Sequence, residues 1–102
     1  MSKLKLKHQD QNDHILLCPL CGSDYLHHST IETFERGEDD AMGMHVIVAG
    51  GSVTAAHDAL IGNPSSRRDG LKIKFCCENC RADLPTLNIL QHKGRTFIEW
   101  EF

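Results

Sequence analysis

Two Cys-x-x-Cys pairs constrain the fold of this chain more than any other feature. The first is Cys18 and Cys21, within CPLCG, and the second is Cys77 and Cys80, within CCENC. Such a turn brings two sulfur atoms to one side of the backbone, and two such turns supply the four thiolates of a tetrahedral zinc site. Segment 22–76 lies between the pairs, so it has to fold back as an insertion for the turns to meet. We therefore predict one structural zinc ion bound by these four cysteines.

A shell of four thiolates favours a structural metal over a catalytic one, because catalytic zinc sites keep an open coordination position. A structural zinc site contributes roughly 10 kcal/mol or more of apparent binding free energy to folding. A thiol-disulfide catalyst is the first alternative, but it uses a Cys-x-x-Cys pair at the start of a helix. Gly22 follows the first pair and Pro85 soon follows the second, so neither begins a convincing helix. Iron bound by four cysteines is the second alternative.

Three other side chains near the pairs are candidate ligands. Cys76 offers a Cys-x-x-x-Cys spacing with Cys80, but the spacing of Cys77 and Cys80 matches that of the first pair. We therefore expect Cys76 to be a strand residue beside the site. His27 and His28 lie just past the first pair, and we expect a polar pair on a strand, one side chain pointing inward and one outward, with a ligand role as the alternative.

The length of 102 residues fits one small domain. We predict a flexible N-terminal tail at residues 1–14 and a zinc-ribbon domain at residues 15–102, with an insertion at residues 35–70. Alternating Leu and Lys near the start offer a short edge strand as an alternative to the tail. The N-terminus has no apolar targeting segment, and the longest apolar run, Val46–Ala49, is too short to span a membrane. We therefore expect a cytoplasmic protein without membrane association, in which cysteines favour metal binding over disulfides.

Apolar and polar residues alternate through much of the chain, which predicts a β-rich fold. The expected strands are Tyr25–Phe34, Val46–Ala49, Leu71–Phe75, Leu84–Gln91 and Thr96–Phe102. His92–Arg95 predicts a hairpin turn and Gly62–Gly70 a loop, by their turn-forming residues. Segment Ser52–Ile61 is ambiguous, since Ser52 could cap a helix. We predict a zinc ribbon with rubredoxin-like knuckles, an antiparallel three- to five-stranded sheet and an inserted hairpin or short helix.

The formal net charge of −3 differs from the strongly basic balance of proteins that coat nucleic acid. The positive charges concentrate in segment 61–102, at Arg67, Arg68, Lys72, Lys74, Arg81, Lys93 and Arg95. They could form a phosphate-binding surface. We favour a solvated face balanced by carboxylates, namely Glu78, Asp83, Glu99 and Glu101.

The aromatic residues at the end of the chain, Trp100 and Phe102, alternate with glutamates. Base-stacking platforms need exposed aromatic rings among basic residues. We therefore expect the two rings to pack in the core against the strand Leu71–Phe75.

Three segments together resemble a group of small uncharacterised bacterial and phage-borne zinc-ribbon proteins: CPLCG, NPSSRRDGLKIKFCCENC and LNILQHKGRTFIEW. The likeness runs from Cys18 to Trp100, and its more specific parts are RRDG and the QHKG-T-x-x-E-W ending. The resemblance implies a zinc-ribbon fold, bound zinc and a bacterial or phage origin, and it implies no activity.

We see no catalytic constellation and expect a protein that is not an enzyme. The first functional hypothesis is a structural zinc-binding domain that acts as a binding module for a protein or nucleic-acid partner. The alternative is a structural or assembly protein that forms a homo-oligomer without a nucleic-acid role. A homodimer through an exposed edge strand such as Val46–Ala49 would be one form of this alternative.

Overall fold

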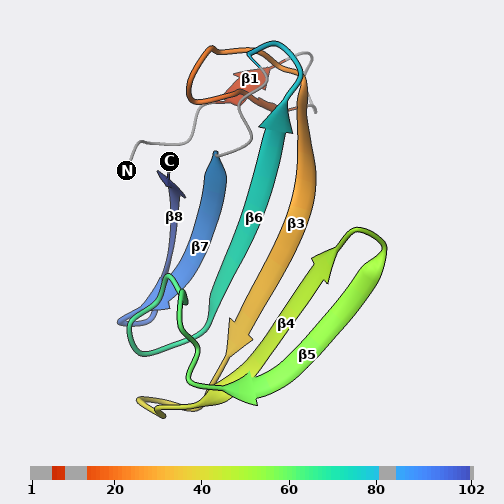
Figure 1. Cartoon of the computed structure of the whole chain (residues 1–102). Coiled ribbons are helices and arrows are strands. Elements are labelled where there is room, and N and C mark those ends of the chain that lie inside the picture. The colour runs from red at the N-terminus through yellow and green to blue at the C-terminus, as the bar shows by residue number, and fades with distance from the viewer. Residues whose placement is uncertain (1–5, 9–13, 81–84, 102) are drawn as a thin grey trace.

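Strands with alternating side chains join into one antiparallel sheet in the computed structural model of this chain, which describes residues 6–8, 14–80 and 85–101. The sheet has six strands in the order β5-β4-β3-β6-β7-β8 (Figure 1). Their bounds are β3 (Leu26–Glu35), β4 (Gly43–Ala49), β5 (Ser52–Asp58), β6 (Gly70–Cys77), β7 (Thr86–His92) and β8 (Arg95–Glu101). No helix within these ranges is long and apolar enough to cross a membrane.

The predicted β-rich fold is confirmed, but the sheet has one strand more than the predicted maximum. The additional strand is β5, which lies in the segment whose sequence is ambiguous and where a helix was one alternative. Gly50 and Gly51 form a two-residue turn with φ of +58° and +81°. Backbone with positive φ at both positions suits the tight turn of a hairpin. It folds the following residues back onto β4, so a helix starting at Ser52 is wrong.

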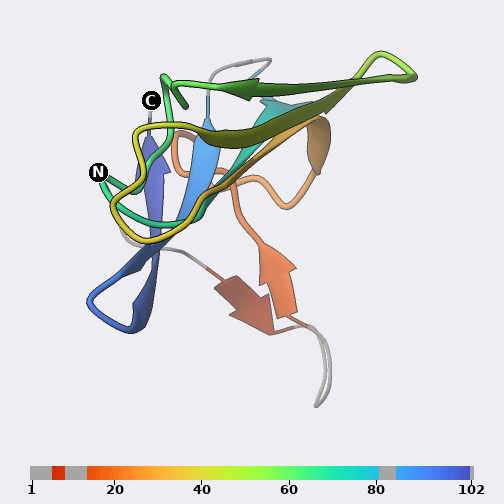
Figure 2. The same ribbon diagram turned by 90° about the horizontal axis from the view of Figure 1, so that it is seen from below.

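The inserted segment therefore extends the sheet, and β4 is an internal strand between β3 and β5. The expectation that Val46–Ala49 forms an exposed edge is wrong, because β5 covers the outer side of β4. Figure 2 shows the β4–β5 hairpin reaching outward from the remaining strands. The second predicted hairpin is confirmed, with Lys93 and Gly94 as its two turn residues.

The N-terminal region contributes a separate two-stranded sheet of β1 (Leu6–His8) and β2 (His14–Leu16). Part of the predicted tail is thus a strand, as the alternating Leu and Lys residues allowed. His14, the last residue of the predicted tail, begins β2, and residues 1–5 and 9–13 lie outside the described residues, as do Arg81, Asp83 and Phe102.

One face of the large sheet is apolar, and cross-strand register defines it as two rows. The first row runs across all six strands through Val53, Val48, Ile31, Ile73, Leu87 and Trp100. The second runs beside it through Ala55, Val46, Thr33, Leu71, Ile89 and Ile98. We call these two rows the apolar face.

Burial changes steeply along the apolar face. Trp100 is 0% exposed and Leu87 is 8% exposed, whereas Val48 is 43% and Val53 is 68% exposed. The ring of Phe75 meets Trp100 edge to face, with ring centroids 5.7 Å apart. The predicted packing of Trp100 against the strand Leu71–Phe75, which lies within β6, is therefore confirmed. Within the first row, the β7–β8 end is therefore buried and the β4–β5 end is exposed.

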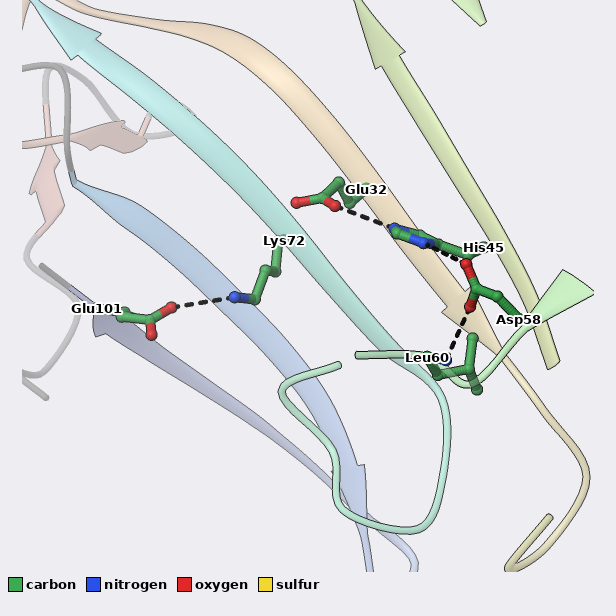
Figure 3. A network of polar contacts seen from close by, with 6 residues as sticks. All are labelled: Glu32, His45, Asp58, Leu60, Lys72 and Glu101. Carbon is green, nitrogen blue, oxygen red and sulfur yellow. Dashed lines mark hydrogen bonds and ion pairs between the residues drawn. The ribbon is translucent and has the colours of Figure 1, made fainter. Parts of the chain in front are cut away.

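The opposite face carries a polar network around His45 of β4 (Figure 3). Its Nε2 lies 3.0 Å from Glu32 Oε1 and its Nδ1 lies 3.2 Å from Asp58 Oδ2. The imidazole also stacks on buried Phe34, with ring centroids 4.4 Å apart. Asp58 accepts a further hydrogen bond from the Leu60 backbone N–H at 2.8 Å. This network joins β3, β4 and the end of β5.

Hydrogen bonds within the loop between β5 and β6, and from this loop to neighbouring segments, hold it in place. Ser65 is 2% exposed, and its hydroxyl donates to the Gln91 carbonyl at 2.7 Å. The same hydroxyl oxygen accepts from the Arg68 backbone N–H at 2.9 Å. The Arg36 backbone N–H donates to Asp69 at 3.0 Å. The RRDG segment is thereby tied to β7 and to the end of β3.

The His45 network predicts a pH dependence of stability. Burial alone lowers the pKa of His45, but hydrogen bonds and charge from Glu32 and Asp58 raise it above 6.5 overall. A raised folded-state pKa means that this stabilisation is fully present below pH 6.5 and is lost as pH rises through the folded-state value. Glu32→Gln should lower the pKa of His45 in an NMR titration of the imidazole and flatten this dependence. Glu99→Gln, on β8, should change neither, and an unshifted His45 in Glu32→Gln would disprove the coupling.

Candidate metal centre

The first Cys-x-x-Cys pair forms a tight knuckle between β2 and β3. The Gly22 N–H donates to the Cys18 carbonyl at 2.9 Å, and the Cys18 N–H donates to the Ser23 carbonyl at 2.8 Å. Gly22 has φ of +79°, a conformation that residues with a side chain rarely adopt. This turn reverses the chain and places Cys18 and Cys21 on one side of it.

The second pair follows β6 without a break, since Cys77 is the last residue of that strand. Its turn is joined to the first knuckle by a hydrogen bond from the Glu78 N–H to the Tyr25 carbonyl, at 3.1 Å. Strand β3 begins after the first knuckle and pairs antiparallel with β6, with Leu26 opposite Cys77. The long segment between the pairs therefore starts and ends at the same end of the sheet, as Figure 1 shows for β3 and β6.

The structure brings the four predicted sulfur atoms together, all within 4.8 Å of one another. Cys18 Sγ lies 3.9 Å from Cys80 Sγ, and Cys21 Sγ lies 3.5 Å from Cys77 Sγ. Four sulfurs placed tetrahedrally around zinc, each about 2.3 Å from the ion, would lie about 3.8 Å apart. The donor atoms and their spacing fit one tetrahedral metal ion. Cys18 and Cys77 are buried, while Cys21 and Cys80 lie at the surface.

Two N–H groups point at these sulfurs. The Leu20 backbone N–H lies 3.4 Å from Cys18 Sγ, and the Asn79 side-chain amide lies 3.5 Å from Cys21 Sγ. The hydrogen bond from Asn79, followed by a backbone hydrogen bond at Ser23, lowers the pKa of Cys21 from 9.0 to about 6. A thiol with this pKa is largely the thiolate at neutral pH, which is the form that binds metals.

The sequence did not single out Asn79 as part of the site. The available signal was its position between the two cysteines of CENC. The sequence alone does not show that the two knuckles lie side by side, so that a residue of the second pair contacts a sulfur of the first.

The other candidate ligands lie outside the sulfur cluster. Alternation along β6 turns the side chain of Cys76 away from that of Cys77, and Cys76 is exposed opposite His27. His27 Nε2 contacts Glu78 Oε2. His28 is also exposed on β3. The expected strand positions of Cys76 and the two histidines are confirmed, but the expected burial of one histidine is wrong, since both are exposed.

Three of the basic residues of segment 61–102 pair with carboxylates. Arg68 lies 3.0 Å from Glu38, and Arg67 lies 3.6 Å from Asp39. Lys72 Nζ lies 3.4 Å from Glu101 Oε1. The favoured interpretation, a balanced charged surface, holds for these three cations, although two of the acidic partners come from the loop after β3 instead of from the predicted glutamates.

Comparisons of this chain with models of protein families, with curated proteins and with solved structures gave no match. The findings thus support a small β domain with clustered cysteines that could hold one metal ion. The resemblance to bacterial and phage-borne zinc-ribbon proteins stays a prediction.

The cysteine assignment makes a direct prediction. Purified protein should contain one zinc ion per chain by elemental analysis, and replacing Cys18, Cys21, Cys77 or Cys80 with Ser should remove it. Loss of the metal should also unfold the knuckle region, because the binding free energy is coupled to folding. Cys76→Ser is the matched control and should keep the full zinc content. Equal metal loss in Cys76→Ser would refute the assignment, and iron in place of zinc would correct the metal.

The contact between Asn79 and Cys21 makes a second prediction. Outer-shell partners that hold metal ligands typically contribute a factor of about 10 or more to affinity. Asn79→Leu should therefore weaken zinc binding about tenfold in a competition titration with a chromophoric chelator. Glu78→Gln changes the neighbouring residue of the same knuckle, whose carboxylate contacts His27 instead of a sulfur, and should leave the affinity unchanged. Identical affinities for both variants would show that the amide has no such role.

Proposed function

We propose that this protein is a structural zinc-binding domain that acts as a binding module for a partner protein. The metal centre would hold the fold together, since four thiolates complete a tetrahedral shell and leave no position for a substrate. The binding role would then belong to surfaces away from the metal.

The observation that carries the proposal is the open part of the apolar face. Val48 and Val53 are exposed at the β4–β5 end, and Met44, on the same side of β4, is 44% exposed. At the opposite edge of the sheet, Ile98 is 47% exposed. Contiguous apolar surface on a soluble domain marks sites of interaction, because leaving it in water is unfavourable.

The shape of the fold supports the same proposal. Domains usually bury the apolar face of a sheet under a second layer. Within the ranges that the structure describes, β1 and β2 pair with each other and form no such layer over the large sheet. Figure 2, which views the sheet from below, shows the two short strands to one side of it.

Charge favours a protein over a nucleic acid as the partner. Binding to phosphates needs cations that are free to replace counterions. Three of the six cations that the structure describes in segment 61–102, namely Arg67, Arg68 and Lys72, have a carboxylate partner. Both rows of the apolar face consist of uncharged residues. A partner with an apolar surface of its own complements this face better than a polyanion does.

A quantitative affinity purification tests the proposal, with zinc content and circular dichroism confirming that each variant is folded. Val48→Asp places a charge on the apolar face and should lower recovery of specific partner proteins at least about tenfold, by desolvation of an unpaired charge at the interface. Thr54→Asp places the same charge on the opposite side of neighbouring β5 and should retain them.

Nucleic acid is the competing outcome. Fluorescence anisotropy with single- and double-stranded oligonucleotides at low salt should show no binding. Binding that weakens steeply with salt, together with equal protein recovery by both variants, would replace the protein-binding proposal with the nucleic-acid one.

A further inference from the structure

Strand β5 ends the sheet, and the geometry of its turn determines which backbone groups face outward. A two-residue hairpin loop makes Ala49 and Ser52 a hydrogen-bonded pair. Hydrogen-bonded and non-hydrogen-bonded pairs then alternate along the two strands. Val53, Ala55 and His57 occupy the non-hydrogen-bonded positions toward β4. Their N–H and C=O groups therefore point away from β4, toward the open edge.

This edge lacks the features that normally block pairing with another strand. Native edges carry Lys, Pro or a β-bulge, or are covered by another segment. The sequence of β5 is SVTAAHD, its register with β4 is continuous, and its first six residues are exposed. The opposite edge strand, β8, differs because it carries Arg95, Glu99 and Glu101. Of the two edges of the large sheet, β5 is the one open to pairing.

The residues of β5 are complementary to a second β5 in antiparallel orientation. Centring the pair on Ala55 puts Ala55 opposite Ala55, Val53 opposite His57 and Ser52 opposite Asp58. No residue of like charge faces its own kind in this register, and Ala55 is small enough for close approach across the axis. The outward N–H and C=O groups of Ala55, Val53 and His57 meet one another, as a hydrogen-bonded antiparallel pair requires. Because a two-fold axis relates the two strands, the outward N–H and C=O groups of both β5 edges are hydrogen-bonded at once.

We propose that two copies of this protein form a dimer in which their β5 strands pair antiparallel about Ala55. The two sheets then join into one, and the apolar face continues from one copy to the other through Val53 and Ala55. This contact goes beyond the proposed partner binding, because it uses the backbone edge of β5 instead of the side chains of the apolar face. An extended peptide from another protein is the competing occupant of the edge.

Substitutions of opposite charge at Ala55, the residue on the two-fold axis, test the dimer in the zinc-loaded protein. Wild type should sediment as a concentration-dependent dimer. Ala55→Lys and Ala55→Glu each place two like charges directly opposite one another and should each weaken the dimer about fivefold or more. An equimolar mixture of the two variants should form a heterodimer at least as tightly as wild type. Thr54→Lys carries the same charge to the neighbouring position, where it faces Ala56, and should weaken the dimer less than Ala55→Lys.

The outcomes separate the interpretations. A wild type that stays monomeric at all concentrations overturns the proposal and leaves the edge to another partner. If neither Ala55 variant weakens the dimer, or if the mixture of the two variants does not recover association, the proposal is overturned as well, because the contact then lies elsewhere. The result is independent of the affinity purification, since monomeric protein can still bind its partner through the apolar face.

Discussion

The pairing of β3 with β6 is the interaction on which the rest of the structure depends. Leu26 lies opposite Cys77, so the strand that leaves the first knuckle runs beside the strand that enters the second. This register brings the four sulfurs within 4.8 Å of one another across a long gap in the sequence. Pairing residues so far apart in the chain costs loop-closure entropy. A metal bound by both knuckles would offset that cost, because it links the two ends of the same strand pair. A metal ion bound by these cysteines and the central ladder would therefore stabilise each other.

Stability is distributed unevenly over the sheet as a result. Trp100 of β8, Leu87 of β7 and Cys77 at the end of β6 are buried. The β4–β5 hairpin depends instead on its ladder, on the stacking of Phe34 with His45 and on the polar bridge between Glu32 and Asp58. Elements with few buried apolar contacts open at lower free energy than the core. Binding at the hairpin would add contacts where the isolated chain has fewest.

Local chemistry accounts for what could be predicted from the sequence. The spacing within each cysteine pair, the alternation of Leu71–Phe75 and the glycine of the last turn each act over a few residues, and each appears in the structure as expected. Ser52–Asp58 went unresolved because its composition suits a weak helix as well as a strand, and only pairing with β4 decides between them. The contacts of His45 and Asn79 could not be predicted from the sequence for a similar reason. Their partners come from other strands and from the other knuckle, so they depend on register instead of local pattern.

The same dependence on register explains why the surfaces of this domain lie far from its metal. Cysteines that close a coordination shell have no chemistry left for a substrate, and strand order carries the inserted hairpin to the edge of the sheet farthest from β8. Strand β5 is separated from β6, which ends at Cys77, by β4 and β3, and Asp58 at its end contacts His45 of β4. The metal end is constrained by geometry, since each sulfur must stay within reach of one ion. The proposed roles of this domain therefore belong to the apolar face and the β5 edge, and a metal ion held by the four cysteines would support the strand pairing that orders both.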